Sequence, residues 1–185
     1  MKNIIYLLML TIIFSCKAQT YPLRTYGIKI PQNAYLKDTN NELPSYEGTW
    51  KGTWNNKVIF LTLKKRNYVF TSTMLGYYAD ILIGKFKVTD NNGNVLFDNT
   101  NLSDAEAKIE GGRFRKKDGK YSLTYSDMDI CGLNGFIQIN FTDSTKTKLA
   151  WKFDEGDFII TKDCPYYSSP EFPQPLPKEI ILTKQ

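Results

Sequence analysis

Short runs of alternating hydrophobic and polar residues dominate the chain from residue 47 onward. In Gly48–Trp54 the side chains of Trp50, Gly52 and Trp54 share one face of an extended strand, because successive side chains of a strand point to opposite faces. Two indoles separated by a residue without a side chain indicate a curved sheet whose backbone comes close to something packed across it. This run is the first predicted strand of the main domain.

Similar runs follow along the rest of the chain, separated by turns rich in Gly, Asn and Asp. Residues 80–89 alternate regularly, with Leu82, Phe86 and Val88 predicted to point inward. Asn92-Gly93 then predicts a hairpin, because this pair readily adopts the positive φ angles of a type I′ turn. The other predicted strands are residues 57–65, 68–75, 95–97, 108–116, 120–126, 135–142, 147–154, 157–162 and 179–183.

Helix signals are nearly absent, since the one candidate helical turn is residues 102–107, with Ser103 as its N-cap. Many short strands joined by tight turns are typical of an antiparallel meander, which removes its edges most simply by closing on itself. We therefore expect an all-β fold, an up-and-down meander closing into a small β-barrel, with a two-sheet β-sandwich as second choice. Its later strands would turn inward Tyr121, Leu123, Tyr125, Ile137, Ile139, Phe141, Leu149, Trp151 and Phe153.

The N-terminus carries an export signal. An apolar run over residues 4–14, broken only by Thr11, is too short to span a bilayer and fits the core of a signal peptide. It ends in Ile13-Phe14-Ser15-Cys16, which resembles the bacterial lipobox and implies that Cys16 carries diacylglycerol and becomes the mature N-terminus. Cleavage after Ala18 is the competing interpretation, and either one takes the protein out of the cytoplasm.

These features predict three parts of the chain. Residues 1–15 form the lipoprotein signal peptide, residues 16–46 the lipidated cysteine and a tether, and residues 47–185 a single β-barrel domain. The tether contains several prolines and no sustained periodicity, yet it holds enough aromatic and aliphatic residues to pack against the domain.

Residue counts narrow the possible chemistry. Once Cys16 is assigned to lipid, Cys131 and Cys164 remain as an even pair in an oxidising compartment, so we expect a disulfide; two buried free thiols are the alternative. The chain contains no histidine, which removes Ser-His and Cys-His nucleophile pairs and the commonest zinc ligand. We predict a protein that is not an enzyme and uses no metal or cofactor.

Three groups of side chains could still carry a function. Tyr77 and Tyr78, with Tyr166 and Tyr167, could line a barrel mouth or a sugar-stacking platform, although capping the core is the plainer interpretation. Acidic residues could ligate Ca²⁺ or act as an acid–base pair, although the plainer interpretation is a solvated turn at Asp127 and Asp129 and a hairpin tip at Asp154, Glu155 and Asp157. A basic stripe over residues 113–117 is read as a solvated face, not a nucleic-acid site, because the protein is exported.

Two resemblances add expectations. Gly48-Thr49-Trp50 resembles the Gly-x-Trp signature on the first strand of lipocalins, which implies a lipocalin-like barrel. Lipocalins usually add an arginine that packs on this tryptophan near the last barrel strand, and no arginine follows Arg115 here. A likeness over most of the chain is to a family of short Bacteroidota lipoproteins catalogued as a domain of unknown function; it is carried by residues 14–19, 21–25, 47–54, 176–178 and 182–185.

Together these observations predict a lipid-anchored protein of the cell envelope, on the periplasmic or surface face of the outer membrane. Its partners would be membrane lipid through acylated Cys16 and a small apolar ligand, a glycan or another envelope protein, with no nucleic acid. A structural or interaction lipoprotein with a filled barrel is the alternative, and a carboxylate-dependent hydrolase is a third.

Overall fold

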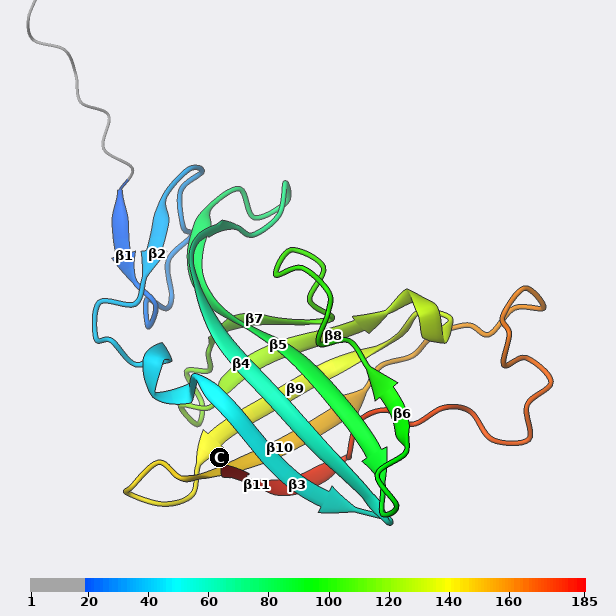
Figure 1. Ribbon diagram of the computed structural model, residues 1–185. Coiled ribbons are helices and arrows are strands. Elements are labelled where there is room, and N and C mark those ends of the chain that lie inside the picture. The colour runs from blue at the N-terminus through cyan, green and yellow to red at the C-terminus, as the bar shows by residue number, and fades with distance from the viewer. Residues whose placement is uncertain (1–18) are drawn as a thin grey trace, which may run out of the picture.

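Residues 19–185 are the part of the chain that this computed structural model describes, and β-strands make up most of their regular structure (Figure 1). The predicted signal peptide and Cys16 lie outside the described residues. Within residues 19–185 no helix is long and apolar enough to cross a membrane.

Two short 3₁₀ helices are present, η1 (Leu43–Tyr46) and η2 (Met128–Ile130). The strands are β1 (Thr20–Pro22), β2 (Tyr35–Lys37), β3 (Gly48–Trp54), β4 (Lys57–Phe70), β5 (Tyr78–Asp90), β6 (Val95–Asp98), β7 (Ile109–Phe114), β8 (Tyr121–Asp127), β9 (Leu133–Phe141), β10 (Lys148–Glu155) and β11 (Glu179–Lys184).

Eight strands close into an antiparallel barrel in the order β3-β4-β5-β7-β8-β9-β10-β11, with β11 returning to pair with β3. This confirms the predicted up-and-down barrel over the two-sheet sandwich. The closing strand β11 lies between β10 and β3, and the other seam joins β5 to β7. On the side of β5 that faces this seam, successive parts of the strand pair with β2, then β7 and then β6.

Two hairpins differ in how they turn. Between β3 and β4, Asn55 and Asn56 have φ angles of 44° and 60°, the positive pair that a two-residue type I′ turn needs. The predicted hairpin between β5 and β6 is present, but within it only Gly93 has a positive φ, at 87°. The type I′ assignment at Asn92-Gly93 is therefore wrong, because Asn92 does not adopt the required conformation.

Large side chains fill the barrel interior. The inward faces expected from the sequence are buried along β5, β8, β9 and β10, except that Phe141 is only partly buried. Trp50 lies in the core, and its Nε1 donates to the carbonyl of Tyr46 at 2.8 Å, so η1 covers this end of the barrel. A Cβ at Gly52 would lie 2.6 Å from Cδ1 of Ile180 on β11, which is the close approach that the Trp-x-Gly-x-Trp pattern indicated.

The segment before the barrel packs on it through a buried carboxylate. Asp80 accepts hydrogen bonds from the Tyr35 hydroxyl, from the Asp38 backbone N–H at 2.9 Å and from the Tyr68 backbone N–H at 3.1 Å. Lys65 Nζ lies 3.0 Å from Asp38 and 3.9 Å from Asp80. These contacts, with the parallel pairing of β2 to β5, hold residues 20–46 against the end of β4 and β5.

Three predicted elements are wrong. Residues 68–75 are not a separate strand, because β4 continues through a bulge between Arg66 and Val69 to Phe70 and a loop follows. Residues 157–162 form no strand, since β11 already occupies the place beside β10. Residues 102–107 form turns instead of a helix: Ser103 and Glu106 exchange hydrogen bonds, but so short a segment cannot nucleate one.

Candidate functional site

A pocket opens at the end of the barrel where β8 passes into η2. Its volume is about 190 Å³, and we call it the end pocket. Residues from five separate regions line it, so it exists only in the folded chain: Phe86, Leu96, Phe97, Asp98, Asn99, Lys108, Asp127, Asp129, Ile130 and Tyr166.

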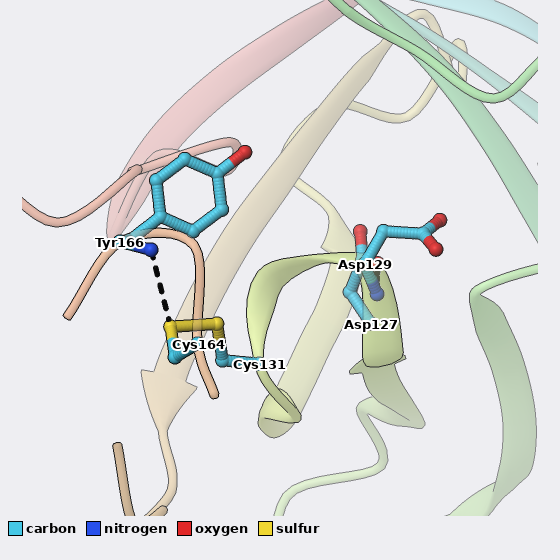
Figure 2. The surroundings of a disulfide bond; sticks show 5 residues. All are labelled: Asp127, Asp129, Cys131, Cys164 and Tyr166. Atoms are coloured by element: carbon cyan, nitrogen blue, oxygen red, sulfur yellow. Dashed lines mark hydrogen bonds between the residues drawn. A yellow bond between two sulfur atoms is a disulfide. The ribbon is translucent and has the colours of Figure 1, made fainter. Parts of the chain in front are cut away.

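A disulfide ties one wall of this pocket to the barrel. Cys131 and Cys164 are bonded with their Cα atoms 5.5 Å apart, which confirms the predicted pair. Figure 2 shows the bond joining the turn after η2 to the segment that carries Tyr166, whose backbone N–H donates to Cys164 Sγ at 3.4 Å. The bond thus holds Tyr166 in place within a long segment, residues 156–178, that contains no strand.

Asp127 is the buried charge of the end pocket. Its Oδ1 accepts from Lys108 Nζ at 2.5 Å and from the Asp129 backbone N–H at 3.0 Å, and its Oδ2 accepts from the Tyr125 hydroxyl at 2.9 Å. Lys108 also contacts Asp129 Oδ2 at 2.6 Å. Both oxygens of Asp127 are therefore engaged, and an ammonium group stands where a Ca²⁺ ion would have to bind.

These contacts shift the pKa values of Lys108 and Tyr125. Burial lowers the pKa of Lys108, but the hydrogen bonds and charges of Asp127 and Asp129 outweigh this effect and leave the pKa raised. Burial raises the pKa of Tyr125, and the neighbouring Asp127 carboxylate raises it further. Lys108 therefore remains a cation and Tyr125 a neutral hydroxyl across the physiological range.

One buried donor in the end pocket has no partner. The side chain of Asn99 is held by its Oδ1, which accepts from the Phe86 backbone N–H at 2.6 Å, while its Nδ2 makes no hydrogen bond. A buried N–H₂ left unpaired costs about 1–3 kcal/mol, so such a group is informative wherever it lines a cavity. Asn99 lines the pocket, although its Nδ2 atom is itself buried, so a ligand oxygen would satisfy this donor only if the side chains covering it shift.

The other acidic candidates do not join this site. Asp154 near the end of β10 pairs with Lys152 at 2.9 Å and accepts from Gln138 at 3.3 Å. Glu155 ends β10, and Asp157 follows in the long segment, so these residues are not the hairpin tip that the sequence suggested. Among residues 19–185 no cluster of three His, Cys, Asp or Glu side chains could hold a metal ion.

The four candidate tyrosines lie at different ends of the barrel. Tyr166 lines the end pocket, and its neighbour Tyr167 is exposed. Tyr77 is buried just before β5, and its hydroxyl accepts from Arg113 Nη2 at 2.8 Å. Tyr78 stacks on Tyr68 with ring centroids 4.2 Å apart. They therefore cannot form one platform.

Tyr77 lines a second depression, a groove of about 340 Å³ on the outside of the barrel between the β4–β5 loop, β2 and β7. The basic stripe is partly paired here, because Arg113 contacts Tyr77 and Arg115 lies 3.3 Å from Asp118.

Sequence reasoning did not single out Asn99, Lys108 or Phe97. Asn99 lies one residue beyond β6, where an asparagine looks like any other turn residue. Only its buried position and its contact with Phe86 distinguish it. Of the end-pocket residues, the sequence pointed to Asp127, Asp129 and Tyr166.

The fold and this pocket define the protein as a closed eight-stranded β-barrel with a disulfide-bounded pocket at one end. The chain belongs to a family of unknown function (DUF6705), whose model matches residues 1–185. Membership in a family of unknown function is thereby confirmed, while the family's Bacteroidota and lipoprotein character stays a prediction. No curated protein and no solved structure matches the chain.

Proposed function

We propose that this protein is an exported, lipid-anchored cell-envelope protein that is not an enzyme and binds a small ligand in the end pocket. The lipobox-like Ile13-Phe14-Ser15-Cys16 supports the anchor. The Cys131–Cys164 disulfide is consistent with an oxidising compartment outside the cytoplasm. The single observation that carries the binding role is that Asn99, whose buried Nδ2 has no hydrogen-bond partner, lines the pocket.

The pocket lining favours a polar ligand with one apolar face. Asn99 and Lys108 offer hydrogen-bond donors to ligand oxygens, while Phe97 and Tyr166 offer aromatic surface. Sites for drug-sized ligands occupy about 300–1,000 Å³. The end pocket, at about 190 Å³, is smaller. A terminal sugar residue of a glycan combines the required size, oxygen atoms and apolar ring face.

The filled interior argues against a carrier of apolar molecules inside the barrel. Trp50, Phe86 and Trp151 are at most 1% exposed, and Ile137 is fully buried. This packing favours the second candidate, a structural or interaction lipoprotein whose barrel is only a scaffold. A carboxylate-dependent hydrolase has less support, because both oxygens of Asp127 are already engaged by Lys108, Tyr125 and the Asp129 backbone.

Binding can be tested by thermal shift and isothermal titration of the purified protein against a panel of mono- and oligosaccharides. We expect saturable binding that weakens about ten-fold in Tyr166→Ala, through loss of the aromatic face. The matched control is Tyr167→Ala, which removes the adjacent exposed ring. Asn99→Asp keeps the acceptor for the Phe86 N–H but replaces the free donor, so it should weaken binding without unfolding the protein.

Absence of any sugar binding, or equal loss in both tyrosine variants, would overturn the ligand role and leave the filled-barrel scaffold. The anchor is tested separately. Labelled palmitate should be incorporated into the wild-type chain and not into Cys16→Ala; an unlabelled wild type would refute lipidation.

A further inference from the structure

We infer that the edge of the molecule where β1, β2 and β5 begin is a membrane-contacting face that lies on an anionic bilayer surface. The inference rests on the proposed anchor at Cys16, but its evidence is the geometry, exposure and charge of residues that the anchor does not include.

Strand direction brings three segments to this edge. β1 pairs in parallel with β2, and β2 pairs in parallel with β5, so all three strands begin on the same side. Thr20 is opposite Tyr35, and Tyr35 is opposite Tyr78, in one row across the strands. Adjacent strands lie about 4.8 Å apart, so Thr20 and Tyr78 are about 10 Å apart. The start of β1, the end of the β1–β2 connection and the β4–β5 loop therefore lie at one edge (Figure 1).

The same edge exposes apolar and aromatic side chains. Met74 at the tip of the β4–β5 loop is 92% exposed, and Leu75 beside it is also exposed. Gly76 contacts the β1–β2 connection through the Asn33 backbone N–H, which donates to its carbonyl at 2.6 Å. We call the set Tyr68, Phe70, Met74 and Leu75 the apolar edge.

Aromatic rings within and beside the apolar edge pack against one another. Tyr68 stacks on Tyr78 at 4.2 Å, Phe70 meets Tyr78 at 5.3 Å and Tyr35 meets Tyr68 at 4.9 Å, measured between ring centroids. Tyrosine and tryptophan gather at membrane–water interfaces because their rings combine an apolar body with a polar group. A row of tyrosines next to exposed aliphatic residues matches that environment.

The charge around this edge is net positive. Residues 19–46 and 64–80 contain six basic residues and three acidic ones, Asp38, Glu42 and Asp80. Asp38 and Asp80 are buried beside Lys65, and Glu42 pairs with Arg24 at 2.7 Å. Basic groups close to an anionic bilayer each contribute about 1 kcal/mol of attraction. Apolar residues at the tip and cations behind them are the arrangement that binds anionic lipid.

The opposite end of the barrel differs in this respect. It also exposes apolar side chains, among them Met128, which is 80% exposed. However, residues 154–171 contain five acidic residues and one basic residue, and Asp127 and Asp129 lie nearby. An anionic bilayer would repel this end, so it faces away from the membrane and leaves the end pocket open.

Chain length connects the edge to the anchor. Four residue steps separate Cys16 from Thr20, and a fully extended chain covers at most about 3.6 Å per residue. A lipidated Cys16 at the bilayer would hold Thr20 within about 14 Å of it. The edge next to Thr20 is then the part of the barrel that meets the lipid.

The test uses the full chain, purified from membranes and reconstituted into vesicles of phosphatidylcholine with phosphatidylglycerol. An environment-sensitive fluorophore is attached at Met74→Cys and, as the matched control, at Met128→Cys. Both native side chains are highly exposed methionines, at opposite ends of the barrel. We expect a blue-shifted emission and quenching by nitroxide-labelled lipid at position 74, and neither at position 128. Leu75→Cys serves as a second probe if Met74→Cys does not fold.

Charge is tested with the same labelled chain. Replacing phosphatidylglycerol by phosphatidylcholine, or adding salt, should reduce the quenching at position 74. Met74→Asp in the apolar edge should weaken binding of the Cys16→Ala chain to anionic vesicles by about ten-fold.

The outcomes separate this inference from the anchor. If palmitate labels Cys16 but positions 74 and 128 give the same emission, the anchor stands and the membrane-contacting face is wrong. If palmitate does not label Cys16, the anchor is wrong; the labelled chain is then added to preformed vesicles, where quenching at position 74 alone still supports the face and its absence overturns it.

Discussion

Gly111 and Gly112 are neighbours on β7, and we predict that replacing each by alanine has opposite effects on stability. A Cβ at Gly111 would lie 2.7 Å and 2.8 Å from the backbone O and N of Leu82 on β5, and closer still to the Tyr121 hydroxyl. A Cβ at Gly112 would have its nearest contact at 3.5 Å, from the Ser122 carbonyl, which is ordinary packing. Neither glycine has a positive φ, so an alanine fits both backbones.

The cost at Gly111 follows from what the new methyl group meets. Its neighbours include backbone atoms of the β5–β7 seam, which cannot rotate away, and overpacking of this kind costs about 1–3 kcal/mol. The Tyr121 hydroxyl also accepts from the Leu82 backbone N–H at 3.2 Å, and displacing it leaves a buried donor unpaired, at about 1–3 kcal/mol more. Replacing glycine by alanine also lowers the conformational entropy of the unfolded chain, which offsets about 0.4–1 kcal/mol of this loss in stability.

We therefore expect Gly111→Ala to lower the free energy of unfolding by about 2–4 kcal/mol, a drop in Tm of roughly 5–15 °C for a chain of this size. Gly112→Ala should leave stability unchanged or raise it by about 0.4–1 kcal/mol. Urea titration followed by circular dichroism measures both.

A double-mutant cycle isolates the hydroxyl clash. Tyr121→Phe alone removes the acceptor of the Leu82 N–H, and in combination with Gly111→Ala it also removes the shortest contact. The double variant should therefore be more stable than the sum of the single effects predicts. If Gly111→Ala and Gly112→Ala differ by less than about 0.5 kcal/mol, the close approach of β7 to β5 is not what the structure describes.

Three further perturbations test the packing of the described chain. Opening the Cys131–Cys164 bond by a double Cys→Ser substitution should cost about 3–4 kcal/mol from its sequence separation of 33, and the wild type should show no reactive thiol at these positions when unfolded without reductant. Burial raises the pKa of Tyr46 to about 12. The contribution of neutral Tyr46 to stability is therefore complete below the ordinary tyrosine pKa of about 10 and is lost as the pH rises toward 12. Tyr46→Phe should reduce that alkaline loss of stability, as followed by absorbance at about 295 nm and circular dichroism. Asp80→Ala leaves three hydrogen-bond donors without their acceptor, so it should destabilise the protein by about 3 kcal/mol or more and expose residues 20–46 to protease. Tyr35→Phe removes one of these donors and should cost only about 1 kcal/mol. Equal effects of the two substitutions would contradict the central role of the Asp80 carboxylate.

The alternation of side chains along the chain by itself determines most of the barrel. Trp50, Gly52 and Trp54 indicated a strand whose backbone approaches a neighbour, and Ile180 is that neighbour. The inward faces of β8, β9 and β10 followed from period two alone, because a residue's face depends only on its position along its own strand. The disulfide followed from counting cysteines, since two remained after Cys16 was set aside.

Contacts between distant residues decided the rest. Residues 157–162 have strand-like composition but form no strand, because β9 and β11 occupy both sides of β10. Gly111 and Gly112 are alike in sequence, and only the positions of Leu82 and of the Tyr121 hydroxyl leave no space for a Cβ at Gly111. The end pocket depends in the same way on five chain regions meeting, so the unpaired Nδ2 of Asn99 leaves no trace in the local sequence. Local pattern fixes which way a side chain faces, whereas its partners depend on which segments the closed barrel brings together.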